Sequence, residues 1–300
     1  MLVGFSALVA LFLSRQTRAD AAISYPIFVT TTVFMAFAIW EFLPGRIDHH
    51  NMQIIGLLMI CVGLERWSRN GGILIGLDTL ICIVIGVEGL PLIAMAFMGL
   101  VGCFVFRLPG SGDVLVAAAC TILALTIPAG LVFLGPAGMV STQCDAFPAP
   151  YIVLALGCSS VLLVGTLALS QRKPLIRAAG LAATGAAFIG SAGFMFPRCL
   201  SGPYWMIDPL TRRDWLDRVS QEQSFIYYFG HRQFTIVMLL MVLVCISIAA
   251  LPVVARDARQ GSTGLAIVFA IAALSLVLTL LQTRNIPLPS LSFHSFCPTH

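Results

Sequence analysis

Residues 73–106 read ILIGLDTLICIVIGVEGLPLIAMAFMGLVGCFVF, and this apolar run decides how many membrane helices the chain forms. The run is much longer than the roughly 20 residues that one helix needs to cross the hydrocarbon core of a bilayer. Gly89-Leu90-Pro91 lies near its middle. Because proline lacks a backbone donor and restricts the residue before it, a chain reversal is favoured there. The sequence therefore predicts two short helices in this run, 73–89 and 91–106.

The overall composition indicates the same class of protein. Of the 300 residues, 59% are hydrophobic and only 10% are charged, and the mean hydropathy is +0.97. Soluble domains carry roughly 25% charged residues, so we expect an all-α, polytopic transmembrane protein in contact with a lipid bilayer. The net charge of +4 does not indicate a nucleic-acid partner, because the basic residues lie in short connections between apolar runs.

Breaks in the apolar pattern give about ten membrane segments, of which the first covers only about half a span. We expect one transmembrane domain over residues 1–283, followed by a polar tail at 284–300. The short first segment leads us to expect that the chain is N-terminally truncated. The predicted segments are 1–13, 21–45, 47–66, 73–89, 91–106, 114–139, 151–170, 178–197, 233–255 and 263–283.

The basic residues fall largely on one side of this arrangement. Among the short connections, the opposite side holds only Arg46. The positive-inside rule then places the basic side in the cytoplasm. Without a reversal near Pro91, the connection 171–177 would move to the outer side, against that rule. The long connection 198–232 is predicted to be extracytoplasmic, with a short amphipathic helix in 211–220. The cytoplasmic residues are Arg15, Arg18, Arg66, Arg69, Arg107, Arg172, Lys173, Arg177, Arg256 and Arg259.

One stretch, Arg46-Ile47-Asp48-His49-His50-Asn51-Met52-Gln53, places consecutive ionisable groups beside membrane-spanning sequence. A carboxylate and two imidazoles are costly there unless they face water, a partner or an ion. Asp, His and Asn together also form a suitable ligand set for a divalent cation. Three interpretations remain open: a hydrated interfacial loop, a proton or ion path in a transporter, and a metal-dependent site.

Spacing brings a further carboxylate, Glu88, to the same membrane depth. Asp48 lies about 20 residues before the turn at 67–72 and Glu88 about 18 residues after it, which gives similar depths at 1.5 Å per helical residue. Antiparallel neighbouring helices would bring Glu88 towards Asp48 and His50, in one polar cavity. The alternative is an interfacial carboxylate paired with Arg46.

The segment GRIDHHNMQ, residues 45–53, resembles the second acidic motif of the GT-C glycosyltransferase superfamily, and looks closest to the catalytic subunit of oligosaccharyltransferase. In that family an Asp-x-His or Asp-x-Asp pair binds Mn²⁺ or Mg²⁺ beside the donor phosphate. The resemblance implies that Asp48 and His50 are metal ligands. It also implies donor-binding or ligand-supporting roles for Arg46, Asn51, Gln53, His231 and Arg232.

The resemblance extends to the turn at 88–91 and to the segment CLSGPYWMIDPLTRRDWLDRV, residues 199–219. The acceptor motif WWDYG of oligosaccharyltransferase is not found in the sequence. The first acidic motif, which usually supplies the catalytic base, belongs to a region that we expect to precede this chain. Glu88 is then the candidate catalytic base.

Together these features predict a membrane glycosyltransferase. It would transfer a sugar from a polyprenyl-phosphate-linked donor to an unidentified acceptor, at the extracytoplasmic face of a bacterial inner membrane. As a truncated form it is expected to be nearly inactive, because losing a general base typically costs about 10²–10⁴ in rate. Two alternatives remain: a transporter or lipid-handling protein with a polar site, and a non-catalytic membrane protein. A transporter should show internal repeats, and the sequence shows no clear repeat.

Two of the nine cysteines differ from the others. Cys144 and Cys199 lie in predicted extracytoplasmic connections, each beside a helix end, where the environment is oxidising. We predict a disulfide between them, which requires Cα atoms within about 7 Å. The alternative is two unrelated cysteines. The remaining seven lie in apolar segments or in the tail and are interpreted as small hydrophobic residues.

Overall fold

The computed structural model describes residues 50–144, 147–201, 208–214 and 263–281, together with separate positions between 229 and 261. The chain divides into two compact units, Met1–Gly202 and Pro203–His300. All regular secondary structure in the described residues is helical, which confirms the predicted all-α class. The number of ten segments, the GT-C fold and the single domain over 1–283 stay predictions.

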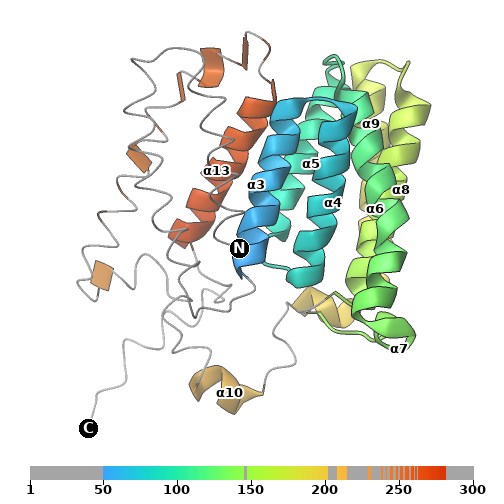
Figure 1. Ribbon diagram of the computed structural model, residues 1–300, viewed down its shortest axis with the longest axis vertical. Helices are drawn as coiled ribbons and strands as arrows, with labels where there is room; N and C mark the ends of the chain where they lie inside the picture. Colours follow the sequence, from blue (N-terminus) through green and yellow to red (C-terminus); the bar gives the residue numbers. More distant parts are fainter. Residues whose placement is uncertain are drawn as a thin grey trace. The chain divides into compact units, whose positions relative to one another are not determined.

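The helices of the first unit are the ones that position the candidate site, and the second unit contributes two helices within the described residues (Figure 1). In the first unit they are α3 (His50–Arg66), α4 (Arg69–Ile85), α5 (Leu90–Val105), α6 (Ser111–Phe133), α7 (Gly135–Met139), α8 (Ala149–Leu169), α9 (Pro174–Met195) and the 3₁₀ helix η1 (Pro197–Ser201). In the second unit they are α10 (Pro209–Asp214) and α13 (Thr263–Leu281).

The long apolar run at 73–106 forms two helices, as its central Gly-Leu-Pro predicts. α4 ends at Ile85 and α5 begins at Leu90. Gly89 precedes the first turn of α5, and Pro91 lies within that turn, where a missing amide leaves no helical bond unmade. The reversal therefore returns the chain through the bundle in the opposite direction.

The long helices of the first unit form one bundle, in which successive helices alternate in direction (Figure 1). The closest packing joins α3 to α4, α4 to α6, α6 to α8 and α8 to α9. At one end, the indole Nε1 of Trp67 donates a hydrogen bond of 2.8 Å to the carbonyl oxygen of Pro109. The Arg107 guanidinium likewise donates one of 3.0 Å to the carbonyl oxygen of Arg172. These bonds bring three connections that were predicted to share one side to the same end of the helices.

Glycines on two sides of α4 allow it to approach both neighbours closely. A Cβ atom at Gly72 would lie 2.8 Å from the Cβ of Ala117 in α6, and Gly76, one turn further, is equally confined by α6. On the side of α3, a Cβ atom added at Gly63 of α3 would lie 2.7 Å from the carbonyl oxygen of Gly71 of α4. Small residues at such contacts let membrane helices pack backbone against backbone. α4 is therefore the central helix of the α3–α4–α6 contact.

The start of α4 differs from the prediction. The connection expected at 67–72 is shorter, because α4 already begins at Arg69. Ser68 is the N-cap: its Oγ accepts a hydrogen bond of 3.2 Å from the amide of Gly71. A serine in this position satisfies one of the first free amides of a helix, which is the physical reason for the earlier start.

The predicted segment 114–139 is also divided. α6 ends at Phe133, and the short helix α7 follows it. Gly135 has φ 67°, in the left-handed region. Glycine adopts this conformation without steric cost and commonly follows the last residues of a helix. Pro136 then lies in the first turn of α7.

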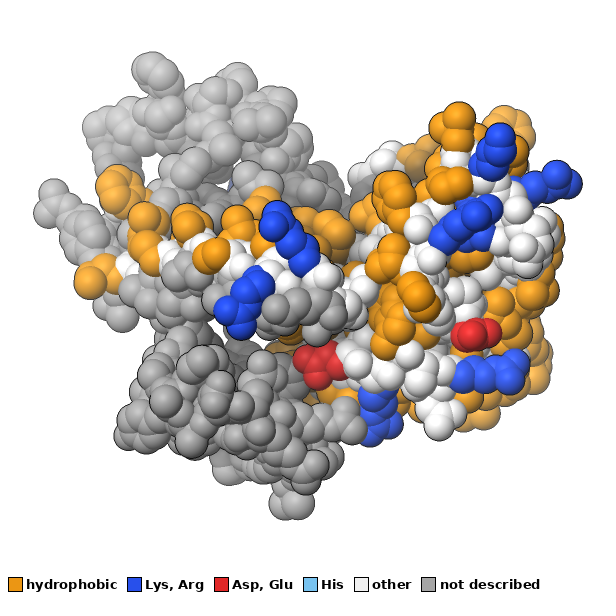
Figure 2. All heavy atoms as spheres, turned by 90° about the horizontal axis from the view of Figure 1, so that it is seen from above, with side chains coloured by type: hydrophobic (Ala, Val, Ile, Leu, Met, Phe, Trp, Pro, Cys, Tyr) orange, Lys and Arg blue, Asp and Glu red, His pale blue; other side chains and the backbone are white. Residues whose placement is uncertain are grey.

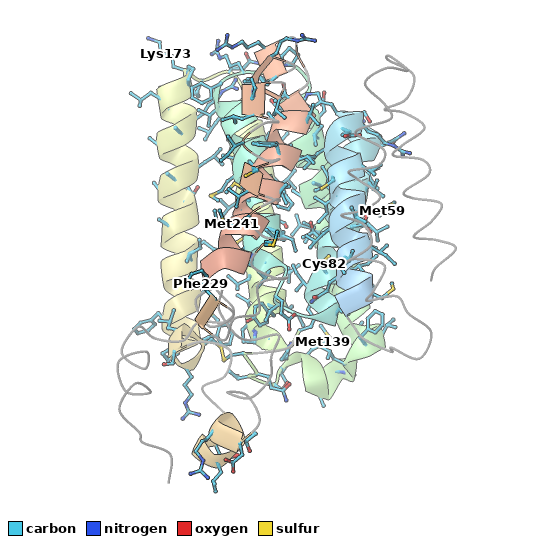
Figure 3. The ribbon with its side chains drawn as sticks, turned by 90° about the vertical axis from the view of Figure 1, so that its left-hand side faces the viewer. Met59, Cys82, Met139, Lys173, Phe229 and Met241 are labelled. Atoms are coloured by element: carbon cyan, nitrogen blue, oxygen red, sulfur yellow. A yellow bond between two sulfur atoms is a disulfide. The ribbon has the colours of Figure 1, made fainter. Side chains whose placement is uncertain are left out.

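Three helices in the described residues are long and apolar enough to cross a membrane: α6, α8 and α9. They support association with a lipid bilayer. The end of the helices that carries Lys173 (Figure 3) lies opposite the end that carries Met139. Viewed onto the former end, Lys and Arg side chains stand out among apolar ones (Figure 2). Within the first unit, the basic residues of the connections 67–72, 107–113 and 171–177 thus lie at one end, as the positive-inside rule requires. Arg15 and Arg18 lie outside the described residues, and which side faces the cytoplasm stays a prediction.

We expect Lys173 and Ser201, placed at opposite ends of α9, to be accessible from opposite sides of the membrane. In intact cells, a membrane-impermeant maleimide should label Ser201→Cys, whereas Lys173→Cys should react only after lysis. The unmodified chain gives the background from native cysteines. The reverse pattern, with Lys173→Cys labelled in intact cells and Ser201→Cys only after lysis, would contradict two crossings in 73–106, and labelling of both from outside would show that α9 does not cross the membrane.

Candidate functional site

The candidate catalytic carboxylate Glu88 contacts the first turns of α3. The side-chain Nε2 of Gln53 donates a hydrogen bond of 2.8 Å to Glu88 Oε2. Gln53 is only 5% exposed, whereas Glu88 lies at the surface of the turn between α4 and α5. The two residues are 35 positions apart in sequence, so the contact depends on the antiparallel pairing of α3 and α4. A buried amide thus holds one oxygen of an exposed carboxylate.

Because Gly86 has no side chain, the side chains of Gln53 and Glu88 have room to meet beside it. A Cβ atom at Gly86 would lie 2.5 Å from Gln53 Nε2 and would also overlap Glu88 Oε2. Its backbone is extended, with φ 177°, so the need for glycine here is steric rather than conformational. Gly86, Gln53 and Glu88 therefore form one packed unit at the end of α4.

The other sequence-predicted site residues are described only in part. α3 begins at His50, and the side chains of His50 and Asn51 lie outside the described residues. Arg46, Asp48, His231 and Arg232 also lie outside them. Gln53 lies three positions after His50. The resemblance assigns it to donor binding, and its side chain donates a hydrogen bond to Glu88. Among the described residues, no group of three or more His, Cys, Asp or Glu side chains could hold a metal ion.

Asp78 is a buried carboxyl group in the middle of α4. It is 6% exposed, and within the described part of the chain its Oδ2 has no hydrogen-bond partner. The basic residues nearest to it in the sequence are Arg66 and Arg69. No ion pair to either arginine is formed between these described residues. Carboxyl groups inside apolar helices are costly and often functional, so Asp78 is a second candidate site residue.

Arg177 was assigned to a polar connection, and the structure shows that this was wrong. α9 begins at Pro174, so Arg177 lies in its first turns, and it is only 6% exposed. Its Nη1 donates to the carbonyl oxygen of Phe104 at 2.6 Å, and its Nε donates to that of Arg172 at 3.0 Å. Nη2 donates to the carbonyl oxygen of Ser170. The guanidinium carbon also lies 4.5 Å from the centre of the Phe104 ring.

These contacts make Arg177 a clamp at the ends of two helices. Phe104 belongs to the last turn of α5, and Ser170 follows the last residue of α8. Carbonyl groups at helix ends lack internal partners, and the helix dipole favours a cation beside them. The positive-inside rule treats an arginine near a helix end as a charge that faces water. It therefore does not predict that Arg177 is buried and binds carbonyl groups at the ends of two helices.

The structure contains the Cys144–Cys199 disulfide, with Cα atoms 5.2 Å apart, inside the limit set from the sequence. It joins the connection after α7 to η1. Tyr151 Oη donates a hydrogen bond of 2.6 Å to the carbonyl oxygen of Cys144, which further fixes this connection to the start of α8.

We expect Cys199→Ser to lower the free energy of unfolding by about 3 kcal/mol, because a bond that closes a loop of this length restricts the unfolded chain. Thermal unfolding in detergent, with and without a reductant, measures the effect. Cys158→Ser removes a free cysteine and is the control. Equal unfolding temperatures for Cys199→Ser and Cys158→Ser would contradict the prediction.

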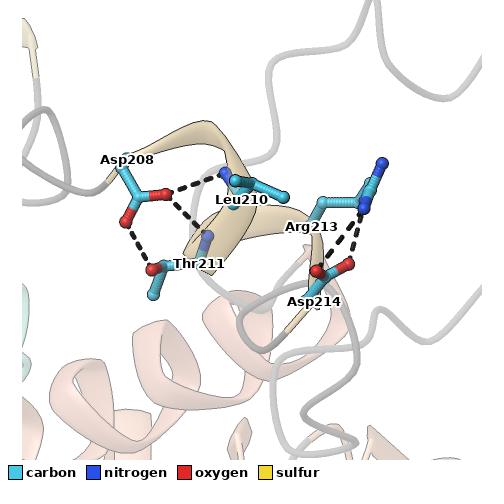
Figure 4. Close-up of polar contacts among 5 residues, drawn as sticks. All are labelled: Asp208, Leu210, Thr211, Arg213 and Asp214. Carbon is cyan, nitrogen blue, oxygen red and sulfur yellow. Dashed lines mark hydrogen bonds and ion pairs between the residues drawn. The ribbon is translucent and has the colours of Figure 1, made fainter.

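The connection predicted to carry an amphipathic helix contains α10, within 208–214 (Figure 4). Asp208 Oδ1 accepts hydrogen bonds from the amides of Leu210 at 2.9 Å and Thr211 at 3.0 Å, and Oδ2 accepts one from the Thr211 hydroxyl. The bonds from Thr211 hold the pKa of Asp208 below its usual range. Asp208 therefore acts as a helix cap.

A cavity of about 620 Å³ lies between α5, α8 and α9. Its walls are almost wholly apolar, with the few polar side chains supplied by α4 and α8. The residues that line it include Thr79, Leu90, Ile93, Phe97, Met98, Val101, Val105, Tyr151, Cys158, Ser159, Ala178, Leu181, Gly185, Phe188 and Ile189. No sequence pattern marks this cavity, because the residues of an apolar lining do not differ from those of a lipid-facing or buried helix surface.

Comparison of the chain with protein-family models, curated proteins and solved structures finds no match.

Proposed function

We propose that the protein is a GT-C type membrane glycosyltransferase that takes a sugar from a polyprenyl-phosphate-linked donor. The observation that supports it best is the hydrogen bond between Gln53 and Glu88. It joins the candidate base to α3 just after the Asp48-His49-His50 stretch, whose resemblance to an acidic metal motif gives the reaction class.

The roles of the residues follow from the chemistry. Glu88 would accept the proton of the acceptor hydroxyl or amide, as a general base. Gln53 would keep that carboxylate oriented, since its own amide is buried and fixed. Asp48 and His50 supply an oxygen and a nitrogen ligand of the kind that Mn²⁺ accepts. A bound divalent cation would offset the negative charge that develops on the departing phosphate.

The test is sugar transfer in proteoliposomes with polyprenyl-phosphate donors and Mn²⁺. We expect Glu88→Gln to lower the rate about 10²-fold, because the amide cannot accept a proton. Asp113→Asn, an exposed carboxylate in the first turn of α6, is the matched control and should not change the rate. Equal metal-dependent rates in Glu88→Gln and Asp113→Asn would oppose the proposal.

The buried Asp78 favours one alternative, a transporter that carries protons or ions. In proteoliposomes that enclose a pH-sensitive dye, such a protein would show proton movement that Asp78→Asn removes and Glu88→Gln preserves. In a glycosyltransferase, the rate of sugar transfer would fall in Glu88→Gln and would be unchanged in Asp78→Asn.

A further inference from the structure

The apolar cavity has the shape of a groove along one side of α5. Lining residues recur at positions 90, 93, 97, 101 and 105, which lie on one side of a helix because of its 3.6-residue period. From the first to the last of them the groove extends about 22 Å, at 1.5 Å per residue. This is most of the roughly 30 Å thickness of a bilayer core. α8 and α9 form the opposite wall.

The two ends of the groove differ in charge. At one end it is lined by Val105 and Ala178, the neighbours of the Arg177 clamp. Arg107, Arg172 and Lys173 lie exposed at that same end. At the other end it is lined by Leu90, two positions from the Glu88 carboxylate. That end also carries Arg198, in η1, so the groove runs from an end rich in cations to one that holds a carboxylate and a cation.

The positive charge at the cationic end exceeds the negative charge there, since among the described residues of that end the carboxylates are Glu65 and Asp113. Arg177 uses its donors on three backbone carbonyl groups, which leaves its charge in place. Arg107 also donates to a carbonyl oxygen. Among the described residues, the recorded ion pairs with a carboxylate include none of Arg107, Arg172 and Lys173. A ligand with an apolar chain and an anionic head would match both the walls and this end.

We propose that the groove binds an acyl chain of an anionic glycerophospholipid, with its phosphate at Arg107, Arg172 and Lys173. The cations are concentrated at the first end, and a phosphate at the other end would approach the like charge of Glu88, so the charges favour this orientation. The site is separate from sugar transfer and does not depend on it. It is a lipid site at the end of the helices that the positive-inside rule assigns to the cytoplasm.

The head group provides the selectivity. In a bilayer an acyl chain gains little from entering the groove, because lipid tails are as apolar as its walls. Basic residues near the membrane surface attract anionic lipids, and salt screens this attraction. We therefore expect the full chain to retain phosphatidylglycerol at least about tenfold more strongly than phosphatidylcholine with the same acyl chains, with the ratio falling as salt rises.

Two variants separate the head-group and chain contacts. Arg107→Gln/Arg172→Gln/Lys173→Gln should abolish the preference between the two lipids. Gly185→Leu should lower retention of both, because Gly185 lines the groove and an added Cβ meets no other atom within 4 Å. Gly190→Leu is the matched control: it lies on the same helix with equally open space but does not line the groove.

The measurement is native mass spectrometry of the full chain in detergent with each lipid, together with the thermal unfolding temperature of every variant. Equal retention of the two lipids, or an unchanged preference in the triple variant, would overturn the proposal. So would unchanged retention in Gly185→Leu, which would mean that the groove is covered by the chain itself. Displacement of the lipid by polyprenyl phosphate, with dependence on Glu88, would assign the groove to a sugar donor instead.

Discussion

Replacing Arg177 by methionine is expected to lower the free energy of unfolding by about 4 kcal/mol or more. Methionine fills a similar volume but donates no hydrogen bond. The carbonyl groups of Phe104, Ser170 and Arg172 would then lose a charged donor at the ends of α5 and α8. The Phe104 and Arg172 carbonyls keep bonds from Arg107, but a hydrogen bond from a charged group contributes about 1.5–3 kcal/mol, and three are lost at once.

Denaturation of the detergent-solubilised chain measures the loss. Lys173→Met changes a neighbouring exposed cation and should be close to neutral, because exposed charges contribute little. Arg177→Lys should fall between the two, since it keeps the charge but lacks the planar group that reaches three carbonyls. Similar stability of Arg177→Met and Lys173→Met would show that the clamp carries no net stabilisation.

Replacing Gly72 by leucine is expected to destabilise the first unit by about 3 kcal/mol or to prevent its assembly. The new side chain would begin with a Cβ atom only 2.8 Å from the Cβ of Ala117, and still closer to the carbonyl oxygen of Val114. Backbone atoms of α6 cannot move aside as a flexible side chain does. α4 would have to separate from α6, which removes the central contact of the bundle.

The matched control is Gly102→Leu, since a Cβ atom at Gly102 meets nothing within 4 Å. This variant also replaces glycine within a helix, so it reproduces the change in helix propensity without the clash. Folded yield and unfolding temperature are compared for the two variants. An unfolding temperature for Gly72→Leu equal to that of Gly102→Leu would mean that the α4–α6 contact adapts without cost.

The sequence predicted the main course of the chain, because that course depends on local signals. Pro91 and the glycine before it were sufficient to divide the apolar run at 73–106, and the structure has the break there. The cysteine pair was found because both residues lie beside helix ends on one predicted side. The start of α4 was placed too late, since hydropathy does not register a serine cap.

The sequence predicted the membrane depth of the candidate site but not the residues that contact one another in it. Counting residues brought Glu88 to the level of the first turns of α3, and it does contact α3 through Gln53. The steric role of Gly86 depends on two side chains from different helices, which no local pattern contains. Arg177 was misplaced for a related reason: its partners lie as far as 73 positions away in the sequence.

The position of the disulfide has a consequence for how the protein is made. Between Cys144 and Cys199 lie the whole of α8 and α9, which leave and return to the same end of the bundle. If α8 and α9 cross the membrane, as their length and composition allow, the two thiols can meet only after both helices have been inserted and the hairpin has closed. If the second helix fails to insert, the cysteines remain on opposite sides of the bilayer and stay reduced. Oxidation of this pair would thus show, in each molecule, that both helices of the hairpin have been inserted.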